Sequence, residues 1–307
     1  MGVIRASVPA GAMMGEKPSL MHGVCLCLGY DGTDFHGWQA QPGLRTIQGM
    51  IEEAIDEMGI EHSQVRGCSR TDAGVHALGQ IASFAAAIEV PREGWISGLN
   101  ARLPEDIVIH DARACYRRYN PRFHAAHKRY RYLIRCGPRR DPMIRRQAWQ
   151  LGPSGMRKDV GPRGDRVEDY LDLDAMRAAA AFFVGEHDFR AFRQSGDQRE
   201  VVVREMRQVS LCPGWGGRPD LLAVEIVGNS FMKNMVRIMV GTLVDIGRGR
   251  LSPNDVPGML GEQAQRAHAG QTAPPQGLTL VDIVLSRFDG PGDAFDRPTL
   301  AEPLCRS

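Results

Sequence analysis

The stretch that most constrains this chain runs from Gly67 to Phe84, where a polar turn leads directly into an apolar strand. Its first half contains Arg70 and Asp72, two charged residues that do not suit the interior of a regular element. Gly74 follows, and glycine can adopt the positive φ of a tight turn. The second half alternates weakly, as a half-buried strand does. The sequence therefore predicts a guanidinium and a carboxylate held on a rigid turn before a buried strand.

Two roles for Asp72 fit this turn. An Asp placed two residues before a Gly most often accepts hydrogen bonds from its own backbone, so a structural role is the more common one. A single carboxylate beside an arginine also suits covalent catalysis, because Arg70 would keep the acid ionised and in position. The turn by itself leaves both roles open.

Helical and strand patterns alternate along the rest of the chain and indicate an α+β protein. Thr46 is an expected N-cap for a helix with a 3.6-residue apolar period. Phe231 to Ile246 is the clearest helix, with Arg237 opposite its apolar stripe and Lys233 one turn earlier. The order of elements is compatible with two α+β halves that meet near residues 120–128. Further helices are expected after Pro91 and from Asp172 or Asp174 to Val184, and strands at 24–30, 79–85, 107–109, 128–135, 201–211, 221–227 and 279–285.

Positive charge is concentrated in one segment. Between Arg113 and Arg146 the sequence has twelve Lys or Arg residues and one acidic residue, whereas the formal net charge of the whole chain is only +2. A solvated surface would explain such a block, but aromatic residues within it favour a nucleic acid. Basic side chains bind phosphates, and aromatic rings stack on unpaired bases. The tyrosines in this segment are Tyr116, Tyr119, Tyr130 and Tyr132; the last two should share one face of a strand.

Composition and missing motifs argue against several classes of protein. No run approaches the roughly 18 apolar residues of a membrane span. Neither Gly-x-Gly-x-x-Gly nor a Walker loop occurs, so no nucleotide cofactor is implied. The seven cysteines include no Cys-x-x-Cys pair, which argues against a zinc ribbon and for a reducing cytoplasm. Residues 1–22 and 289–307 are expected to be loose tails, and 152–169 an exposed insertion.

Short motifs follow one another in a fixed order from Val24 to Val284, and together they resemble the tRNA pseudouridine synthase A family. A match in several ordered motifs is far more specific than any one of them. The motifs are Tyr30-Asp31-Gly32-Thr33 with Phe35-His36-Gly37-Trp38-Gln39; Arg70 to Ala77 with Gly79-Gln80; Leu99-Asn100 with Leu103 to Ile107; Arg122 to Ala125 with Lys128 to Tyr132; Gly185 to Phe189 with Phe192; Asn229-Ser230-Phe231 with Met235-Val236-Arg237 and Gly241; and Gly277-Leu278 with Leu280.

The resemblance implies a fold and an activity. The family fold has two ferredoxin-like, RRM-like α+β halves, here 23–125 and 126–288, whose mainly antiparallel sheets join around a basic central cleft. The family converts uridine to pseudouridine on the 3′ side of the anticodon stem-loop of tRNA. It needs neither a cofactor nor a metal. The resemblance also implies tRNA as the partner, a homodimer and a cytoplasmic location.

The resemblance assigns roles to individual residues as well. Asp72 would be the nucleophile, and attack on the ribose or on the base both stay open. Arg237 would pair with Asp72, Tyr130 would pack on the flipped uracil, and Arg70 would hold a phosphate or the place of the flipped nucleotide. The motif that begins at Phe35 lies near the RNA in the family, although Phe35 and Trp38 would equally suit the core. RNA contacts are expected from Lys128, Arg129, Arg131, Arg139, Arg140, Lys233 and His76.

Two departures from the family pattern matter. Ser69 stands where the family usually has Gly, which would disturb the turn only if this position requires a positive φ. Thr279 replaces an aromatic residue after the Gly-Leu block. Two alternative functions remain: an RNA-binding module without catalysis, and a hydrolase of N-glycosidic bonds. A hydrolase normally needs a second carboxylate to activate water, and no obvious one lies in these motifs.

Overall fold

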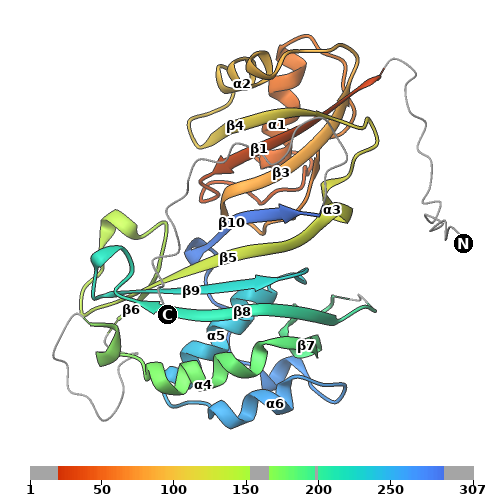
Figure 1. Ribbon diagram of the computed structural model, residues 1–307. Coiled ribbons are helices and arrows are strands. Elements are labelled where there is room, and N and C mark those ends of the chain that lie inside the picture. Colours follow the sequence, from red (N-terminus) through yellow and green to blue (C-terminus); the bar gives the residue numbers. More distant parts are fainter. Residues whose placement is uncertain (1–19, 153–165, 198–199, 287–307) are drawn as a thin grey trace, which may run out of the picture.

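The computed structural model describes residues 20–152, 166–197 and 200–286 of the chain. A ten-stranded sheet runs through the described part in the order β4-β1-β3-β10-β5-β9-β8-β7, with β2 beside β3 and β6 beside β5 (Figure 1). Helices α1 and α2 accompany the N-terminal strands, and α4, α5 and α6 accompany the C-terminal strands. This architecture confirms the predicted α+β class.

The N-terminal half has the ferredoxin-like element order βαββαβ. Its four strands lie in the order β4-β1-β3-β2, and β1 pairs antiparallel with both β3 and β4. Thr46 caps the first helix, since its hydroxyl accepts a hydrogen bond from the Gly49 amide at 3.3 Å. The elements are β1 (His22–Tyr30), α1 (Ile47–Glu57), β2 (Arg66–Gly67), β3 (His76–Ala86), α2 (Arg92–Asn100) and β4 (Ile107–Cys115).

The C-terminal half repeats this order. Its strands lie in the order β10-β5-β9-β8, which corresponds to that of β4-β1-β3-β2 in the first half. Asp172, and not Asp174, caps α4: its carboxylate accepts from the amides of Asp174 and Ala175. The elements are β5 (Ala125–Cys136), α4 (Leu173–Phe183), β8 (Val203–Pro213), β9 (Leu221–Gly228), α5 (Met235–Gly247) and β10 (Leu278–Leu285), with the additional α3 (Pro121–His124), β6 (Trp149–Leu151), β7 (Gly185–Asp188) and α6 (Val256–Met259).

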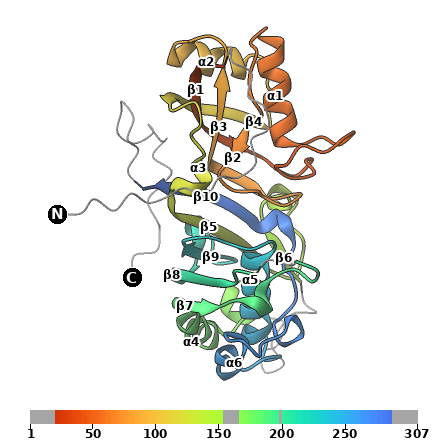
Figure 2. The same ribbon diagram turned by 90° about the vertical axis from the view of Figure 1, so that its right-hand side faces the viewer.

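Strand β10 joins the two halves. It pairs antiparallel with β5 and parallel with the beginning of β3, where Thr279 lies opposite His76 (Figure 2). Strand β2 pairs with the other end of β3, where Arg66 lies opposite Ser83. The connection from β2 to β3, residues 68–75, therefore leaves the sheet at the junction of the two halves. This connection is the polar turn that carries Asp72.

Helix α5 and strand β4 differ in extent from their predicted form. Helix α5 begins at Met235 rather than Phe231, because Asn234 adopts a left-handed conformation with φ of 60° just before it. Strand β4 continues to Cys115, into the basic segment. On β5 the period-two pattern holds, and Tyr130 and Tyr132 share the buried face as predicted. Lys128, for which an RNA contact is expected, lies on that same buried face.

The predicted limits of the loose segments need adjustment. Leu20, in the predicted tail, and Val167, in the predicted exposed insertion, are both buried. Both residues therefore belong to the core. Residues 1–19, 153–165 and 287–307 lie outside the described residues, as do most of the predicted tails and insertion. The division into domains at 125/126 stays a prediction. No helix in the described ranges is long and apolar enough to cross a membrane.

Candidate active site

The backbone of the turn is held by a neighbouring loop that carries Phe35 and Trp38. The Trp38 amide donates to the Thr71 carbonyl at 3.1 Å, and the Gly74 amide donates to the Phe35 carbonyl at 3.3 Å. Gly74 has a φ of +77°, which confirms its predicted turn role. Both aromatic side chains are buried, so their core role, rather than contact with RNA, is the one the structure supports.

A buried polar network fixes the entrance to the turn. Gln80, which is fully buried on β3, accepts from the Ser69 amide at 3.1 Å and donates to the Ser69 carbonyl at 2.7 Å. Its amide also donates to the hydroxyl of Tyr30 at 3.3 Å, and that hydroxyl lies 2.8 Å from the Thr71 hydroxyl. Burial raises the pKa of Tyr30 to about 12, so the phenol stays neutral. The sequence analysis assigned no such supporting role to Gln80 or to Tyr30. A Gln within an apolar strand was one signal that could have indicated the role of Gln80.

Asp72 lies beside Arg237, from the first turn of α5. Their closest carboxylate and guanidinium atoms are 3.7 Å apart, and the side chains are 22% and 14% exposed. Arg237 also donates to the Ala273 carbonyl at 2.7 Å and to the Asn234 side chain at 2.8 Å. Burial lowers the pKa of Arg237, and the charge of Asp72 opposes that shift. The two halves of the protein thus each contribute one member of a partly buried ion pair.

Arg70 does not take the role that local sequence suggested for it. Its side chain is exposed, and the guanidinium that the structure places against Asp72 is that of Arg237. Arg70 was expected beside Asp72 because the two are close in sequence. Arg237 lies on a helix of the other half, so closeness in sequence could not predict it, and the family resemblance did.

Tyr130 approaches the turn from β5. Its hydroxyl lies 2.8 Å from the Ser69 hydroxyl, and its ring meets that of Phe231 edge-on at 5.1 Å. Burial raises the pKa of Tyr130, although the Ser69 hydrogen bond acts in the opposite direction. Among the described non-glycine residues only Asn234 has a positive φ. Ser69 is therefore unstrained, and the departure from the usual Gly adds a hydrogen-bond partner for Tyr130.

The residues predicted to bind RNA fall into two groups, and the first is engaged with protein. Arg129 pairs with Asp282. Arg131 pairs with Glu225 at 2.6 Å and lies over the Trp215 ring at 4.0 Å. Lys128 and His76 are buried: the Lys128 ammonium donates to the Cys68 carbonyl at 2.9 Å, and the His76 ring nitrogens lie 3.1 Å from the Gly32 amide and the Gln276 carbonyl.

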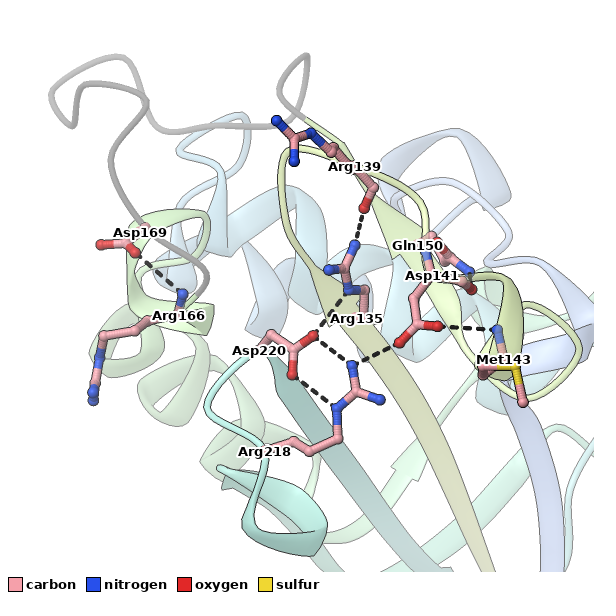
Figure 3. A network of polar contacts seen from close by, with 9 residues as sticks. All are labelled: Arg135, Arg139, Asp141, Met143, Gln150, Arg166, Asp169, Arg218 and Asp220. Carbon is pink, nitrogen blue, oxygen red and sulfur yellow. Dashed lines mark hydrogen bonds and ion pairs between the residues drawn. The ribbon is translucent and has the colours of Figure 1, made fainter.

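The second group, Arg139, Arg140 and Lys233, is exposed. Figure 3 shows how the loop that carries Arg139 is held: Arg135 donates to the Arg139 carbonyl and to Asp220, while the Arg139 guanidinium points away from this network. Arg218 donates to Asp220 and Asp141, both at 2.8 Å, which lowers the pKa of Asp141. The ion pairs therefore fix the loop and leave the Arg139 charge at the surface.

Known proteins resemble this chain over most of its length. A family model described as tRNA pseudouridine synthase matches residues 26–124 and 179–285. The tRNA pseudouridine synthase A of Geotalea uraniireducens is 42% identical over 263 residues, covering 86% of this chain and 99% of the relative. Those of Geobacter sulfurreducens and Acetivibrio thermocellus are 40% and 39% identical, with the same coverage of both chains. The chain belongs to the tRNA pseudouridine synthase family.

Proposed function

We propose that this protein converts uridine to pseudouridine on the 3′ side of the tRNA anticodon stem-loop, with Asp72 as the nucleophile. The observation that carries the proposal is the partly buried ion pair of Asp72 and Arg237 at the junction of the two sheets. A carboxylate on a turn fixed by buried hydrogen bonds is positioned before substrate arrives, and such positioning lowers the barrier of a covalent step.

The reaction is an isomerisation. The Asp72 carboxylate attacks the ribose or the base, the bond between the sugar and N1 of uracil breaks, and the uracil rotates while it stays bound. A bond between the sugar and C5 then forms, the bond to Asp72 breaks and returns the free carboxylate, C5 loses its proton and N1 gains one. Arg237 holds the carboxylate in its ionised form and in place through contacts with both halves of the site. No electrons are gained or lost, so the residues carry the chemistry without a redox partner.

The target uridine has to leave its stack before Asp72 can reach it, which costs a few kcal/mol. We assign Tyr130 to the far side of the flipped uracil, because its ring is fixed edge-on against Phe231 and its hydroxyl against Ser69. Arg70, exposed on the turn, would hold a phosphate or the vacated position in the stack. The exposed Arg139, Arg140 and Lys233 would contact the tRNA backbone.

The experiment that tests the proposal is pseudouridine mapping on unmodified tRNA after incubation with the wild-type protein. Pseudouridine on the 3′ side of the anticodon stem-loop is the expected product. Pseudouridine elsewhere would overturn the assigned position, and free uracil would indicate hydrolysis of the glycosidic bond. Binding without any product would indicate an RNA-binding module.

Replacing Tyr130 by Phe tests its hydroxyl together with its partner Ser69. Tyr130→Phe keeps the ring, so we expect unchanged tRNA affinity and a single-turnover rate about tenfold lower, since a positioned proton-transfer group contributes at least that much. Ser69→Ala should lower the rate about threefold when Tyr130 is present, roughly the value of one neutral hydrogen bond. In the Tyr130→Phe background Ser69→Ala should have no further effect, because the two hydroxyls act as a unit. If the rate reductions of the two single variants simply multiplied in the double variant, the two hydroxyls would act independently.

Replacing Arg139 and Arg140 together by Gln tests the tRNA path. We expect weaker tRNA binding and a slope of log affinity against log salt that is smaller by about 1.8, the value for two phosphate contacts. A matched control removes two exposed arginines elsewhere, Arg102 and Arg177, and should leave the slope unchanged. An equal slope in wild type and in the Arg139/Arg140 variant would place this loop outside the RNA path.

The resemblance also supports a homodimer that binds tRNA across both subunits in the cytoplasm. Sedimentation of the purified protein with and without tRNA measures the number of subunits directly. A monomer in both samples would remove this part of the proposal without affecting the assignment of Asp72.

A further inference from the structure

Helix α3 holds one aromatic side chain out in solvent. Phe123 is 81% exposed, more than any other aromatic side chain in the described residues. The helix around it is held by contacts on both sides of Phe123: Pro121 is buried, and the ring of the exposed His124 stacks on Tyr119 with centroids 4.8 Å apart. Ser286 donates to the His124 carbonyl through its amide at 2.7 Å. The exposure of Phe123 is therefore fixed by its neighbours and does not come from a loosely held segment.

Helix α3 lies beside the entrance to the catalytic turn. The Cys68 thiol donates to the Pro121 carbonyl at 3.3 Å, and Cys68 directly precedes Ser69. Burial lowers the pKa of Lys128, and the positive charge of Arg122 lowers it further, so Arg122 lies close to the ammonium that holds the Cys68 carbonyl. Helix α3 also packs against β2, the strand that leads into the turn.

The surroundings of Phe123 are basic. The chain contains no acidic residue between Asp111 and Asp141. Exposed arginines come from the connection before α3, from α3 itself, and from β2 and the turn; they are Arg117, Arg118, Arg122, Arg66 and Arg70. Among the tyrosines of this segment, Tyr119 and Tyr132 are buried, the buried Tyr130 is assigned to the flipped uracil within the site, and Tyr116 is 64% exposed, less than Phe123. The aromatic surface that this basic segment offers most fully to a ligand is therefore Phe123.

We propose that Phe123 is a stacking platform for an unpaired base of the bound tRNA, adjacent to the nucleotide that reaches Asp72. A large apolar ring in water is unfavourable, and stacking on a base removes one of its faces from contact with solvent. The surrounding positive charge selects a polyanion as the occupant. The proposal rests on the proposed function, because it takes tRNA as the ligand.

Three variants test this platform: Phe123→Ala, Phe123→Trp and the control Phe182→Ala, which truncates a partly exposed Phe on α4. Equilibrium binding to an unmodified tRNA transcript is measured over a series of salt concentrations, together with the single-turnover rate at saturating enzyme. For Phe123→Ala we expect about tenfold weaker binding, the loss typical of one stacked base. The salt slope should not change, because the ring carries no charge. Phe123→Trp and Phe182→Ala should bind as wild type does.

The outcomes separate this proposal from the proposed function. Wild-type affinity in Phe123→Ala would overturn the platform, even if pseudouridine is formed normally. A changed subunit number in Phe123→Ala would also overturn it, and would identify Phe123 as a contact between copies of the chain. If wild type binds tRNA but forms no pseudouridine, the proposed function fails, while the affinities of the Phe123 variants still decide on the platform.

Discussion

Asp72→Asn should form no measurable pseudouridine, while its affinity for tRNA stays within a few-fold of wild type. Asn has nearly the same shape as Asp but lacks the negative charge needed for nucleophilic attack. Loss of a covalent nucleophile typically lowers turnover on the order of 10⁴-fold or more. The turn itself should persist, because Gln80 and Trp38 hold it through backbone groups of Ser69 and Thr71. The measurement is pseudouridine mapping after long incubation, with binding measured on the same preparation.

Two further variants make this result decisive. Asp72→Ala should be equally inactive, and because it has no side-chain amide, it excludes activity that arises when the amide of Asp72→Asn slowly hydrolyses back to a carboxylate. Asp174→Asn, the same change on an exposed residue of α4, should retain full activity. Turnover in Asp72→Ala at more than about a hundredth of the wild-type rate, far above the level expected without a nucleophile, would show that another group attacks the substrate.

The local pattern of the sequence was sufficient for most of the architecture. Thr46 and the apolar period after it predicted α1, and the alternation from Lys128 onward predicted β5 and the common face of Tyr130 and Tyr132. These features depend on neighbours within a few residues, which a sequence displays directly. The start of α5 was missed because a left-handed Asn234 has no comparable local signal.

Long-range pairing limited what the sequence could tell about the site. Charge density in the basic segment did not reveal that Arg129 and Arg131 are neutralised by Asp282 and Glu225, which lie on other strands. The same limit applies to Arg237, whose partner Asp72 belongs to the other half of the chain. Ion pairs of this kind depend on the order of the strands in the sheet. The apolar period of the sequence and the spacing of its motifs contain no information about that order.

Arg237→Gln should lower the single-turnover rate by a factor of about 10² to 10³ with little change in tRNA affinity. At 3.7 Å and an effective dielectric constant of about 20, the two charges attract by roughly 4 kcal/mol, and partial exposure of both side chains reduces that value. Each 1.36 kcal/mol corresponds to about a tenfold change in rate. Gln retains a donor for the Ala273 carbonyl but removes the positive charge beside Asp72.

Arg237→Lys separates charge from geometry. Lys keeps the positive charge but cannot hold the Ala273 carbonyl, the Asn234 side chain and Asp72 together as a planar guanidinium does. We expect its rate to fall between wild type and Arg237→Gln, and thermal unfolding to show that both variants are folded. If folded Arg237→Gln turned over within about threefold of wild type, a loss worth less than one ordinary hydrogen bond, Arg237 would serve to pack the two halves together. Asp72 would then be kept ionised by its other surroundings, and the contribution of the C-terminal half to the catalytic site would reduce to Tyr130.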